Sequence, residues 1–526
     1  MSGLLRSMLS ISAATFLSRA TGYVRIMVFA ALLGTGVVSQ AFSVASALPN
    51  WIYELFLGGI FYSIFIPILI ERITNHGEED AQALTNALFT VALPLLAVVA
   101  AFGVVFAEPL VSLATDWQNA EDLSPAGARE QLEISVLLFR IFVLQLVLYG
   151  ISTIATGVLQ SHRYFFLPTF APVLNNLIII ASFGAYELLD GRDQTLAIYV
   201  LALGATLGVA VMALCLVPTM LRLGYKPRIQ FGHPALASAA RLAGPMLILV
   251  AASVGLQAVG YFFATQFNAA TQLGLAFVIF SLPYGIFVVA IATALMPDLS
   301  EQHSRGDVDG YRDTFSFGLR LVSFVVVPST IGMFVLAKPI VGLLYERGEF
   351  VAQDTQVVAT LLQAYAVGLL GYGVYFLLVR AFYSQQNTLT PALLNVVLFA
   401  LYTGFVYVLS DVIRVVGVVL ALSVAYTILA ALGLAAMRRR IERIDGRRLL
   451  RSLAKILAAG AAMYAVAWGG VNLLGLGTGT LERALVILVV GSVSVAAYLG
   501  VALALRAEEL QAAIDLARRR LRPKEG

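Results

Sequence analysis

The stretch "FLSRATGYVRIMVFAALLG", residues 16–34, is apolar over almost its whole length but carries two arginines, Arg19 and Arg25. A helix of about 20 such residues crosses the ~30 Å hydrocarbon core of a bilayer. An arginine at the centre of a bilayer costs roughly 2.5–3.5 kcal/mol on insertion scales, so such residues face water or a partner charge, or serve a function. The stretch therefore predicts a membrane-spanning helix with functional arginines.

The rest of the chain repeats this apolar pattern. Of 526 residues, 60% are hydrophobic and 12% charged, and the mean hydropathy is +0.88. Soluble domains are about 25% charged, so too little charge is present to cover a soluble helical protein. The first apolar run has no small-residue cleavage site and is interrupted by arginines, which favours a retained span over a signal peptide. The lone Cys215 cannot form an internal disulfide.

Apolar runs separated by polar segments predict an all-α polytopic membrane protein with about 14 transmembrane helices. The predicted spans are 7–34, 39–70, 82–107, 130–157, 165–186, 195–220, 236–266, 269–297, 314–337, 356–383, 389–409, 413–436, 453–473 and 484–505.

Three basic clusters predict the orientation of these spans. They lie at 222–241, 438–455 and 518–524, whereas the segment 108–128 contains no Lys or Arg. Short cytoplasmic loops are enriched in Lys and Arg. Even numbers of predicted spans precede and separate the clusters, so we expect both termini in the cytoplasm. The residues after the last span predict an amphipathic surface helix with the apolar stripe Leu510, Ile514, Ala517 and Leu521.

Weak internal similarity suggests a repeat. "RATG" at 19–22 resembles "RLAG" at 241–244, and "PVLNN" at 172–176 resembles "PALLN" at 391–395, at similar offsets. Chance resemblance between apolar helices is the alternative. Repeats of the same orientation place a substrate at their interface. The predicted domains are an N-lobe at 1–222, a C-lobe at 223–437, a C-terminal helix pair with a basic linker at 438–505, and a cytoplasmic tail at 506–526.

The residue inventory argues against an enzyme. The four histidines lie in predicted loops without metal-ligand spacing, no cysteine pair exists, and no phosphate-binding glycine loop follows a strand. We therefore expect no catalytic residues, no metal and no cofactor, and no nucleic acid as a partner.

Polar residues within the predicted spans are the candidates for function. Arg19 and Arg25 lie about 120° apart around a helix and about 9 Å apart along it, which suits two edges of a broad cavity. Glu54 and Glu133 are candidate counter-ions, and Arg140 shares a helix face with Glu133, so ion pairing is the alternative for Arg140. Cations outnumber carboxylates here, and the arginine fork suits phosphate oxygens. The predicted substrate-binding residues are Ser18, Arg19, Arg25, Asn50, Glu54 and Arg140.

Five motifs in order resemble the MurJ/MviN family of lipid II flippases, within the multidrug/oligosaccharidyl-lipid/polysaccharide exporter superfamily. The resemblance implies two pseudo-symmetric six-helix lobes around a central cavity, two extra C-terminal helices forming a groove for a polyprenyl tail, and alternating access. Arg19 and Arg25 match first-helix arginines implicated in holding the substrate diphosphate. The motifs are "SRATGYVR" at 18–25, "LPNWIYELFLGGIFYSIFIPIL" at 48–69, "YFFLPTFAPVLNN" at 164–176, "LLYERGEFVAQDT" at 343–355 and "RAFYSQQNTLTP" at 380–391.

The sequence departs from the family pattern at several charged positions. Ile26 and Gln40 replace acids, Tyr53 and Glu54 replace arginines, and Val278 replaces an arginine. The acidic cation ligands of some members have no clear match, so the resemblance does not imply sodium coupling here. Either lipid II is held differently or the cargo is another polyprenyl-linked glycan.

The resemblance implies a lipid II flippase of the bacterial plasma membrane. It would move a polyprenyl-diphosphate glycan from the inner to the outer leaflet for peptidoglycan and cell-wall biogenesis, with membrane lipids and cell-wall synthesis proteins as further partners. The alternatives are a flippase for another polysaccharide repeat unit and a non-transporting scaffold for cell-wall enzymes. The sequence does not identify the glycan, the energy source or the oligomeric state.

Overall fold

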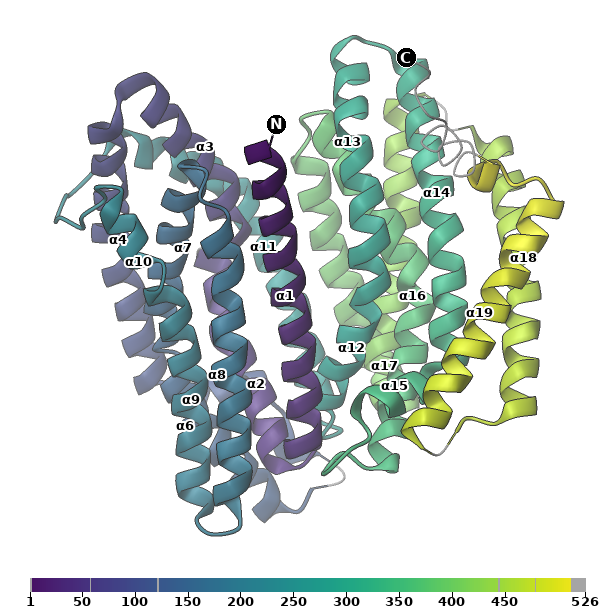
Figure 1. The fold of residues 1–526 in the computed structure, drawn as a ribbon, viewed down its shortest axis with the longest axis horizontal. Helices are drawn as coiled ribbons and strands as arrows, with labels where there is room; N and C mark the ends of the chain where they lie inside the picture. Colours follow the sequence, from purple (N-terminus) through teal and green to yellow (C-terminus); the bar gives the residue numbers. More distant parts are fainter. Residues whose placement is uncertain (1, 57, 121–122, 443–444, 478, 512–526) are drawn as a thin grey trace. The chain divides into compact units, whose positions relative to one another are not determined.

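The computed structural model describes residues 2–56, 58–120, 123–442, 445–477 and 479–511, with side chains except at 2–9, 58–64 and 237–246. The described residues form helices and no strand, as predicted (Figure 1). The chain divides into two compact units, which are described separately. Unit 1 comprises Met1–Thr271 and Arg347–Val351, and unit 2 comprises Gln272–Glu346 and Ala352–Gly526.

Unit 1 is built from the helices of the first half of the chain. These are α1 (Ser2–Leu33), α2 (Val37–Phe56), α3 (Gly58–His76), α4 (Glu78–Val105), α5 (Ala107–Ala114), the 3₁₀ turn η1 (Trp117–Asn119), α6 (Pro125–Phe142), α7 (Gln145–Ser161), α8 (Phe166–Asp190), α9 (Gln194–Leu214), α10 (Val217–Arg222) and α11 (Pro234–Thr265). Side-chain caps fix three of their starts: Ser124 accepts a hydrogen bond from Gly127 N, Asp193 from Leu196 N and His233 from Ala235 N.

Unit 2 holds the remaining helices. They are α12 (Ala270–Pro283), the π-helical turn η2 (Tyr284–Val288), α13 (Val289–Ser304), α14 (Val308–Val335), α15 (Ala337–Tyr345), α16 (Ala352–Ser384), α17 (Leu389–Arg440), α18 (Gly446–Leu474) and α19 (Thr480–Ala504). The predicted amphipathic stripe after α19 continues into 512–526, which lie outside the described residues.

Twelve helical segments among the described residues are long and apolar enough to cross a membrane. Each coincides with predicted spans, and α17 covers two of them. Its backbone leaves the helical region at Ile413 and Arg414, where φ is −128° and 54°. Just beyond, the Cα of Gly417 approaches the Leu409 carbonyl too closely for a Cβ to fit. The predicted span 39–70 falls on α2 and α3, which are separate helices.

The packing units do not follow the predicted division at residue 222. α11, the predicted seventh span, packs on α2 and α3 and belongs to unit 1. Arg347–Val351 also belongs to unit 1, because the amide of Glu349 donates to the carbonyl of Ala31 (2.9 Å). Side-chain packing selects these neighbours, and a sequence repeat carries no information about it. The division by repeat therefore stays a prediction.

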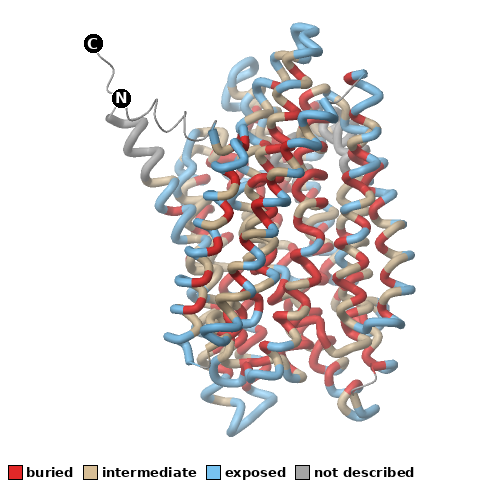
Figure 2. The backbone as a smooth tube through the Cα atoms, turned by 90° about the vertical axis from the view of Figure 1, so that its right-hand side faces the viewer, coloured by how far each residue is buried: buried red, intermediate tan, exposed pale blue. Residues whose placement is uncertain are grey.

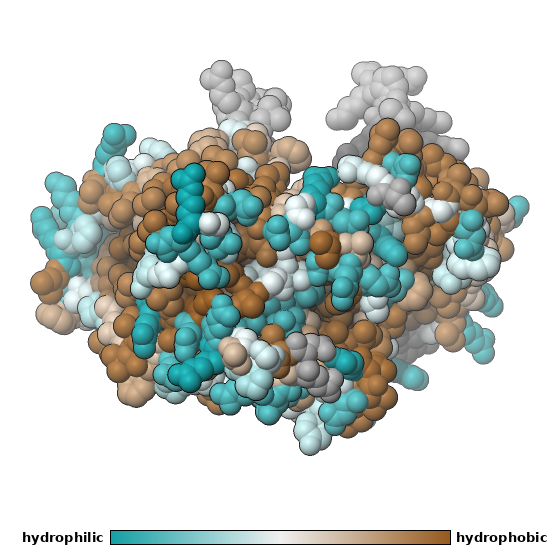
Figure 3. Space-filling model, turned by 90° about the horizontal axis from the view of Figure 1, so that it is seen from below, coloured by the Kyte–Doolittle hydropathy of each residue, from teal (hydrophilic) through white to brown (hydrophobic). Residues whose placement is uncertain are grey.

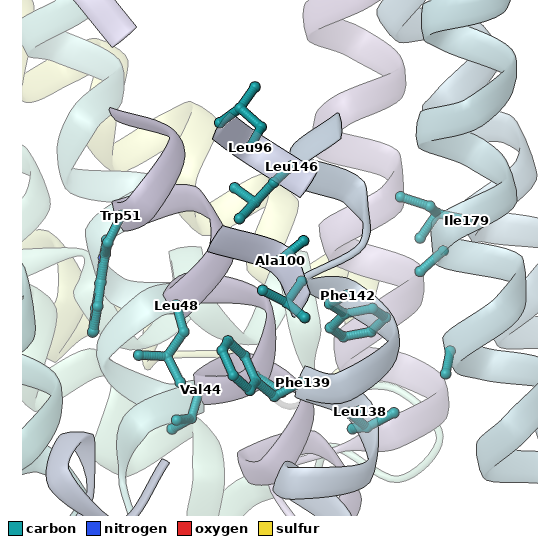
Figure 4. Packing of buried hydrophobic residues seen from close by; sticks show 14 of the residues in the cluster. Val44, Leu48, Trp51, Leu96, Ala100, Leu138, Phe139, Phe142, Leu146 and Ile179 are labelled. Atoms are coloured by element: carbon teal, nitrogen blue, oxygen red, sulfur yellow. The ribbon is translucent and has the colours of Figure 1, made fainter. Parts of the chain in front are cut away.

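The core of unit 1 lies where α2 packs on α6. Val44 and Leu48 of α2 face Phe139 and Phe142 of α6 in Figure 4, and all four are buried. The rings of Phe42 and Phe142 meet edge to face at 5.4 Å, a favourable geometry for aromatic pairs. This contact holds one face of α2 rigidly. Figure 2 shows such buried residues recurring along the helices.

Large apolar side chains also cover the outward faces of the helices. Val98, Leu188 and Leu488 are 66%, 76% and 64% exposed. Hydrophilic residues gather on the end face of the helices and hydrophobic ones along their flanks (Figure 3). In water such apolar faces would aggregate, whereas in a bilayer they contact lipid chains.

Candidate functional site

Arg19 and Arg25 of α1 have no charged partner among the described residues. Arg19 is exposed and Arg25 half-buried. Among the described residues, neither guanidinium forms an ion pair or a hydrogen bond, and Arg25 lies within electrostatic range of Tyr149 on α7. The alternative that these arginines are neutralised by Glu54 or Glu133 therefore fails, because those carboxylates have other partners. The cost of keeping Arg25 in an apolar helix is offset by nothing that the described residues contribute.

Contacts with α8 fix the position of α1. Asn176 Nδ2 donates to the hydroxyl of Thr21 (3.1 Å) and to the carbonyl of Ser18 (3.4 Å). Ser18, Thr21 and Arg25 share one helix face, because they are three, four or seven residues apart. Asn176 thus anchors the turn from which Arg25 projects, and Ser18 takes part through its backbone.

A polar cavity of about 370 Å³ lies between α2 and α11. Its lining includes Asn50, Glu54 and Gln257, and Glu54 accepts a hydrogen bond from Gln257 Nε2 (3.3 Å). Asn50 Nδ2 donates to the Ser46 carbonyl (2.9 Å), which leaves its amide oxygen available as an acceptor. The remaining lining residues are Ser43, Ser46, Ala47, Trp51, Tyr53 and Tyr261.

Tyrosines of α2 and α7 connect this cavity to the surroundings of Arg25. The hydroxyl of Tyr53 bonds that of Thr153 (2.9 Å), and the ring of Tyr53 lies 5.1 Å from that of Tyr149. Tyr149 in turn donates to Gln145 (3.3 Å). Tyr149 therefore lies near both Arg25 and Tyr53, and Tyr53 lines the cavity of Asn50 and Glu54. The sequence analysis did not single out these tyrosines, because they lie within largely apolar spans and their spacing forms no recognisable motif.

This arrangement of side chains is suited to binding a ligand rather than to covalent catalysis. It offers cationic forks, amides, hydroxyls and one carboxylate, which together match a ligand with an anionic group and many hydroxyls or amides. Among the described residues, no three His, Cys, Asp or Glu side chains gather as a metal site requires.

Arg140 lies apart from this cluster. It lines a second cavity of about 700 Å³ beside α5 and α6. The predicted pairing of Arg140 with Glu133 is wrong, because Glu133 pairs with Arg129 one turn away (2.9 Å). No described contact or cavity brings Arg140 to Asn50 or Glu54.

Gln40 shows why one family charge is replaced. Its amide nitrogen donates to the carbonyls of Asn268 (2.8 Å) and Thr35 (3.2 Å), while its oxygen accepts from Thr271 N (3.1 Å). The side chain is fully buried. An ionised acid could not donate to those carbonyls, so glutamine is suited to this position in a way that a carboxylate is not.

Unit 2 contains an apolar groove of about 350 Å³ formed mainly by α14, α18 and α19. Phe324 and Pro328 of α14, Met463 of α18 and Tyr498 of α19 line it. The Tyr498 hydroxyl donates to the Phe324 carbonyl (2.7 Å), so the polar group of this aromatic residue is satisfied. The groove is suited to a flexible hydrocarbon chain.

Comparison with known proteins identifies related chains. The family model of the lipid II flippase MurJ matches residues 29–490, a range that begins after Arg19 and Arg25. A probable lipid II flippase MurJ of Vibrio cholerae is 29% identical over 97% of this chain and 98% of its own length. A lipid II flippase MurJ of Burkholderia cenocepacia is 28% identical over 83% of this chain and 84% of its own.

Solved structures share the fold. A lipid II flippase MurJ in an inward closed conformation gives a TM-score of 0.74 at 21% identity, covering 94% of this chain and 97% of the other. An inward-facing multidrug transporter of the MATE family gives 0.59 at 14% identity, covering 83% and 94%.

Proposed function

The chain belongs to the lipid II flippase MurJ family, and we propose that Arg19 and Arg25 hold the diphosphate of its polyprenyl-linked substrate during transport. The observation that carries this proposal is the unpaired Arg25 in an apolar helix. A charge at membrane depth without an internal partner is maintained where a ligand or water supplies the missing interaction. A diphosphate supplies several oxygens to which the planar guanidinium donates paired hydrogen bonds.

We propose that the α2–α11 cavity receives polar groups of the substrate's headgroup. Asn50 and Glu54 line it together with Ser43 and Ser46. Amide and carboxylate oxygens accept hydrogen bonds from sugar hydroxyls and peptide amides. Ser18 contributes by positioning α1 rather than through its side chain. Arg140 is outside this proposal, because its cavity has no residue in common with that of Asn50 and Glu54.

The apolar groove of α14, α18 and α19 is proposed to hold the polyprenyl tail. A long isoprenoid gains free energy from apolar contact and needs no polar partner. Phe324, Pro328 and Met463 provide such contact.

As a family member the protein is a multi-pass protein of the bacterial inner membrane, with a lipid-linked substrate. We propose that both termini are cytoplasmic, because the basic clusters at 222–241 and 438–455 then lie inside. Transport would run from the inner to the outer leaflet by alternating access, without covalent chemistry. Cell-wall synthesis proteins are proposed partners.

Two measurements test the proposal. Native mass spectrometry of the purified chain should find a bound polyprenyl-diphosphate glycan, and the mass of that glycan separates lipid II from another repeat unit. Arg25→Ala should fail to complement a flippase-depleted strain while remaining inserted in the membrane. A scaffold would instead tolerate Arg25→Ala and lose function when the basic loop 438–455 is neutralised. Full complementation by Arg25→Ala contradicts the proposal.

A further inference from the structure

The cavity beside α6 has a balanced set of charges. Two carboxylates, Glu108 and Glu133, and two guanidinium groups, Arg129 and Arg140, line a volume of about 700 Å³. Leu132, Val136 and Leu137 are among its apolar lining. A cavity with both signs of charge and a partly apolar wall resembles neither a purely anionic nor a purely cationic binding site.

Arg140 is the guanidinium of this set that has no internal partner among the described residues. It forms no hydrogen bond and no ion pair there, and its side chain is exposed. Arg129 and Glu133 pair with each other at 2.9 Å, and both are largely exposed, so this pair is weak and open to exchange. The cavity thus presents one unmatched cation and carboxylates that are available to a second cation.

The position of Arg140 along α6 matches the level of lipid headgroups. Glu133 is the last acid of α6, and the residues that follow are apolar except for Ser135 and Arg140. Seven residues of helix place Arg140 about 10 Å deeper than Glu133. Helical side chains lean toward the N-terminus, and a long arginine reaches back along the apolar surface to the interface. One turn beyond, Leu144 is 50% exposed, as expected of an apolar side chain that contacts acyl chains.

We propose that this cavity binds the headgroup of a membrane phospholipid that carries a phosphate and a primary amine. The guanidinium of Arg140 would bind the phosphate oxygens, and Glu133 or Glu108 would accept hydrogen bonds from the ammonium. The balance of charges excludes a strong preference for anionic headgroups. With the orientation proposed above, this lipid belongs to the outer leaflet. It is distinct from the transported substrate.

The experiment uses the full chain in nanodiscs with equal parts of phosphatidylethanolamine, phosphatidylcholine and phosphatidylglycerol. Native mass spectrometry then reports which lipid stays bound as the particle is activated. Phosphatidylethanolamine should be retained in preference to the other two, since the quaternary amine of phosphatidylcholine donates no hydrogen bond. Arg140→Gln should weaken this retention by about tenfold, the effect of one lost charge-assisted contact. Arg305→Gln is the control, because Arg305 is also exposed but pairs with Glu301 and is not among the residues that line the cavity.

Glu133→Gln makes the test independent of Arg140. The exposed glutamate is replaceable without loss of core packing, and the cavity gains one positive charge. The preference should therefore shift from phosphatidylethanolamine toward phosphatidylglycerol. Equal retention of the three lipids by the wild-type chain overturns the proposal, as does unchanged phosphatidylethanolamine retention in Arg140→Gln or unchanged preference in Glu133→Gln. None of these outcomes depends on whether the chain transports lipid II.

Discussion

Replacing Arg25 by glutamine should stabilise the empty protein while it weakens substrate binding. Arg25 has no ion pair among the described residues, so the glutamine variant recovers part of the roughly 2.5–3.5 kcal/mol that an arginine costs at membrane depth. The recovered part is a fraction, because the side chain is half-buried and Tyr149 is near. Against the bound substrate, the loss of charge-assisted hydrogen bonds costs about 1.5–3 kcal/mol, or about 10- to 150-fold in affinity.

The assay pairs thermal unfolding of the detergent-solubilised protein with titration of a soluble polyprenyl-diphosphate analogue. Arg25→Lys should bind with intermediate affinity, because it keeps the charge and loses the paired donors. Arg483→Gln is the matched control for a structural arginine. Arg483 binds Glu346 (2.6 Å) and the Gly342 carbonyl (3.1 Å), so its loss should lower stability by about 1.5–3 kcal/mol.

One pattern of results would refute a ligand-binding role for Arg25. If Arg25→Gln destabilises the empty protein as Arg483→Gln does and leaves analogue binding unchanged, Arg25 is a structural residue. A rise in unfolding temperature together with weaker binding is the signature expected of a residue that is held in place for its ligand.

Three further perturbations have defined outcomes. Gly417→Ala should destabilise α17 by about 1–3 kcal/mol in thermal unfolding, because its Cβ would collide with the Leu409 carbonyl. Phe142→Ala should cost about 3–5 kcal/mol, because the ring is fully buried against Phe42. Hydrogen bonds from Arg448 and Arg320 hold the pKa of Glu508 below its ordinary value, so its stabilisation is complete above the ordinary pKa and is lost as pH falls through the lower one. The amide protection factors at 507–511, which are corrected for the intrinsic exchange rate, should therefore fall in acid, and Glu508→Gln should remove this pH dependence.

The class of fold was predictable because a bilayer leaves few structural choices. Backbone groups in hydrocarbon must be satisfied within a helix or a closed barrel, so long apolar runs can be assigned as helices one by one. The break within α17 was predictable as a boundary between spans, but its tight geometry was not. The close contact of Gly417 with Leu409 depends on how two helices pack, and that information is not local to the turn.

The grouping of helices was less predictable for the same reason. Hydropathy shows that a helix is buried in a membrane but not which neighbour it packs on. The repeat at residues 19–22 and 241–244 assigned the seventh span to the second lobe. In the structure, α11 closes the polar cavity of unit 1 through Gln257 and Tyr261, and the division into lobes by the repeat stays a prediction.

The candidate site was predictable where charge made a residue conspicuous. Arg25, Asn50 and Glu54 stood out because polar groups are costly in apolar spans. Asn50 and Glu54 line one cavity, and their role in binding together with Arg25 stays a prediction. Arg140 stood out equally but lines another cavity. Intramembrane charge therefore indicates that a residue has a function without indicating which ligand it serves.

The departures from the family's charges have a physical consequence for how the substrate is held. Tyr53 stands where the family resemblance leads us to expect an arginine. Its hydroxyl is hydrogen-bonded to that of Thr153, and its ring packs on the ring of Tyr149. A side chain built into the helix packing in this way cannot extend to a diphosphate as an arginine does. Glu54 is held by Gln257 and adds a negative charge to the same cavity. If Arg19 and Arg25 bind the diphosphate as proposed, they supply the cationic part of binding, and neutralising either should cost this chain a larger share of its affinity than in a relative with more arginines.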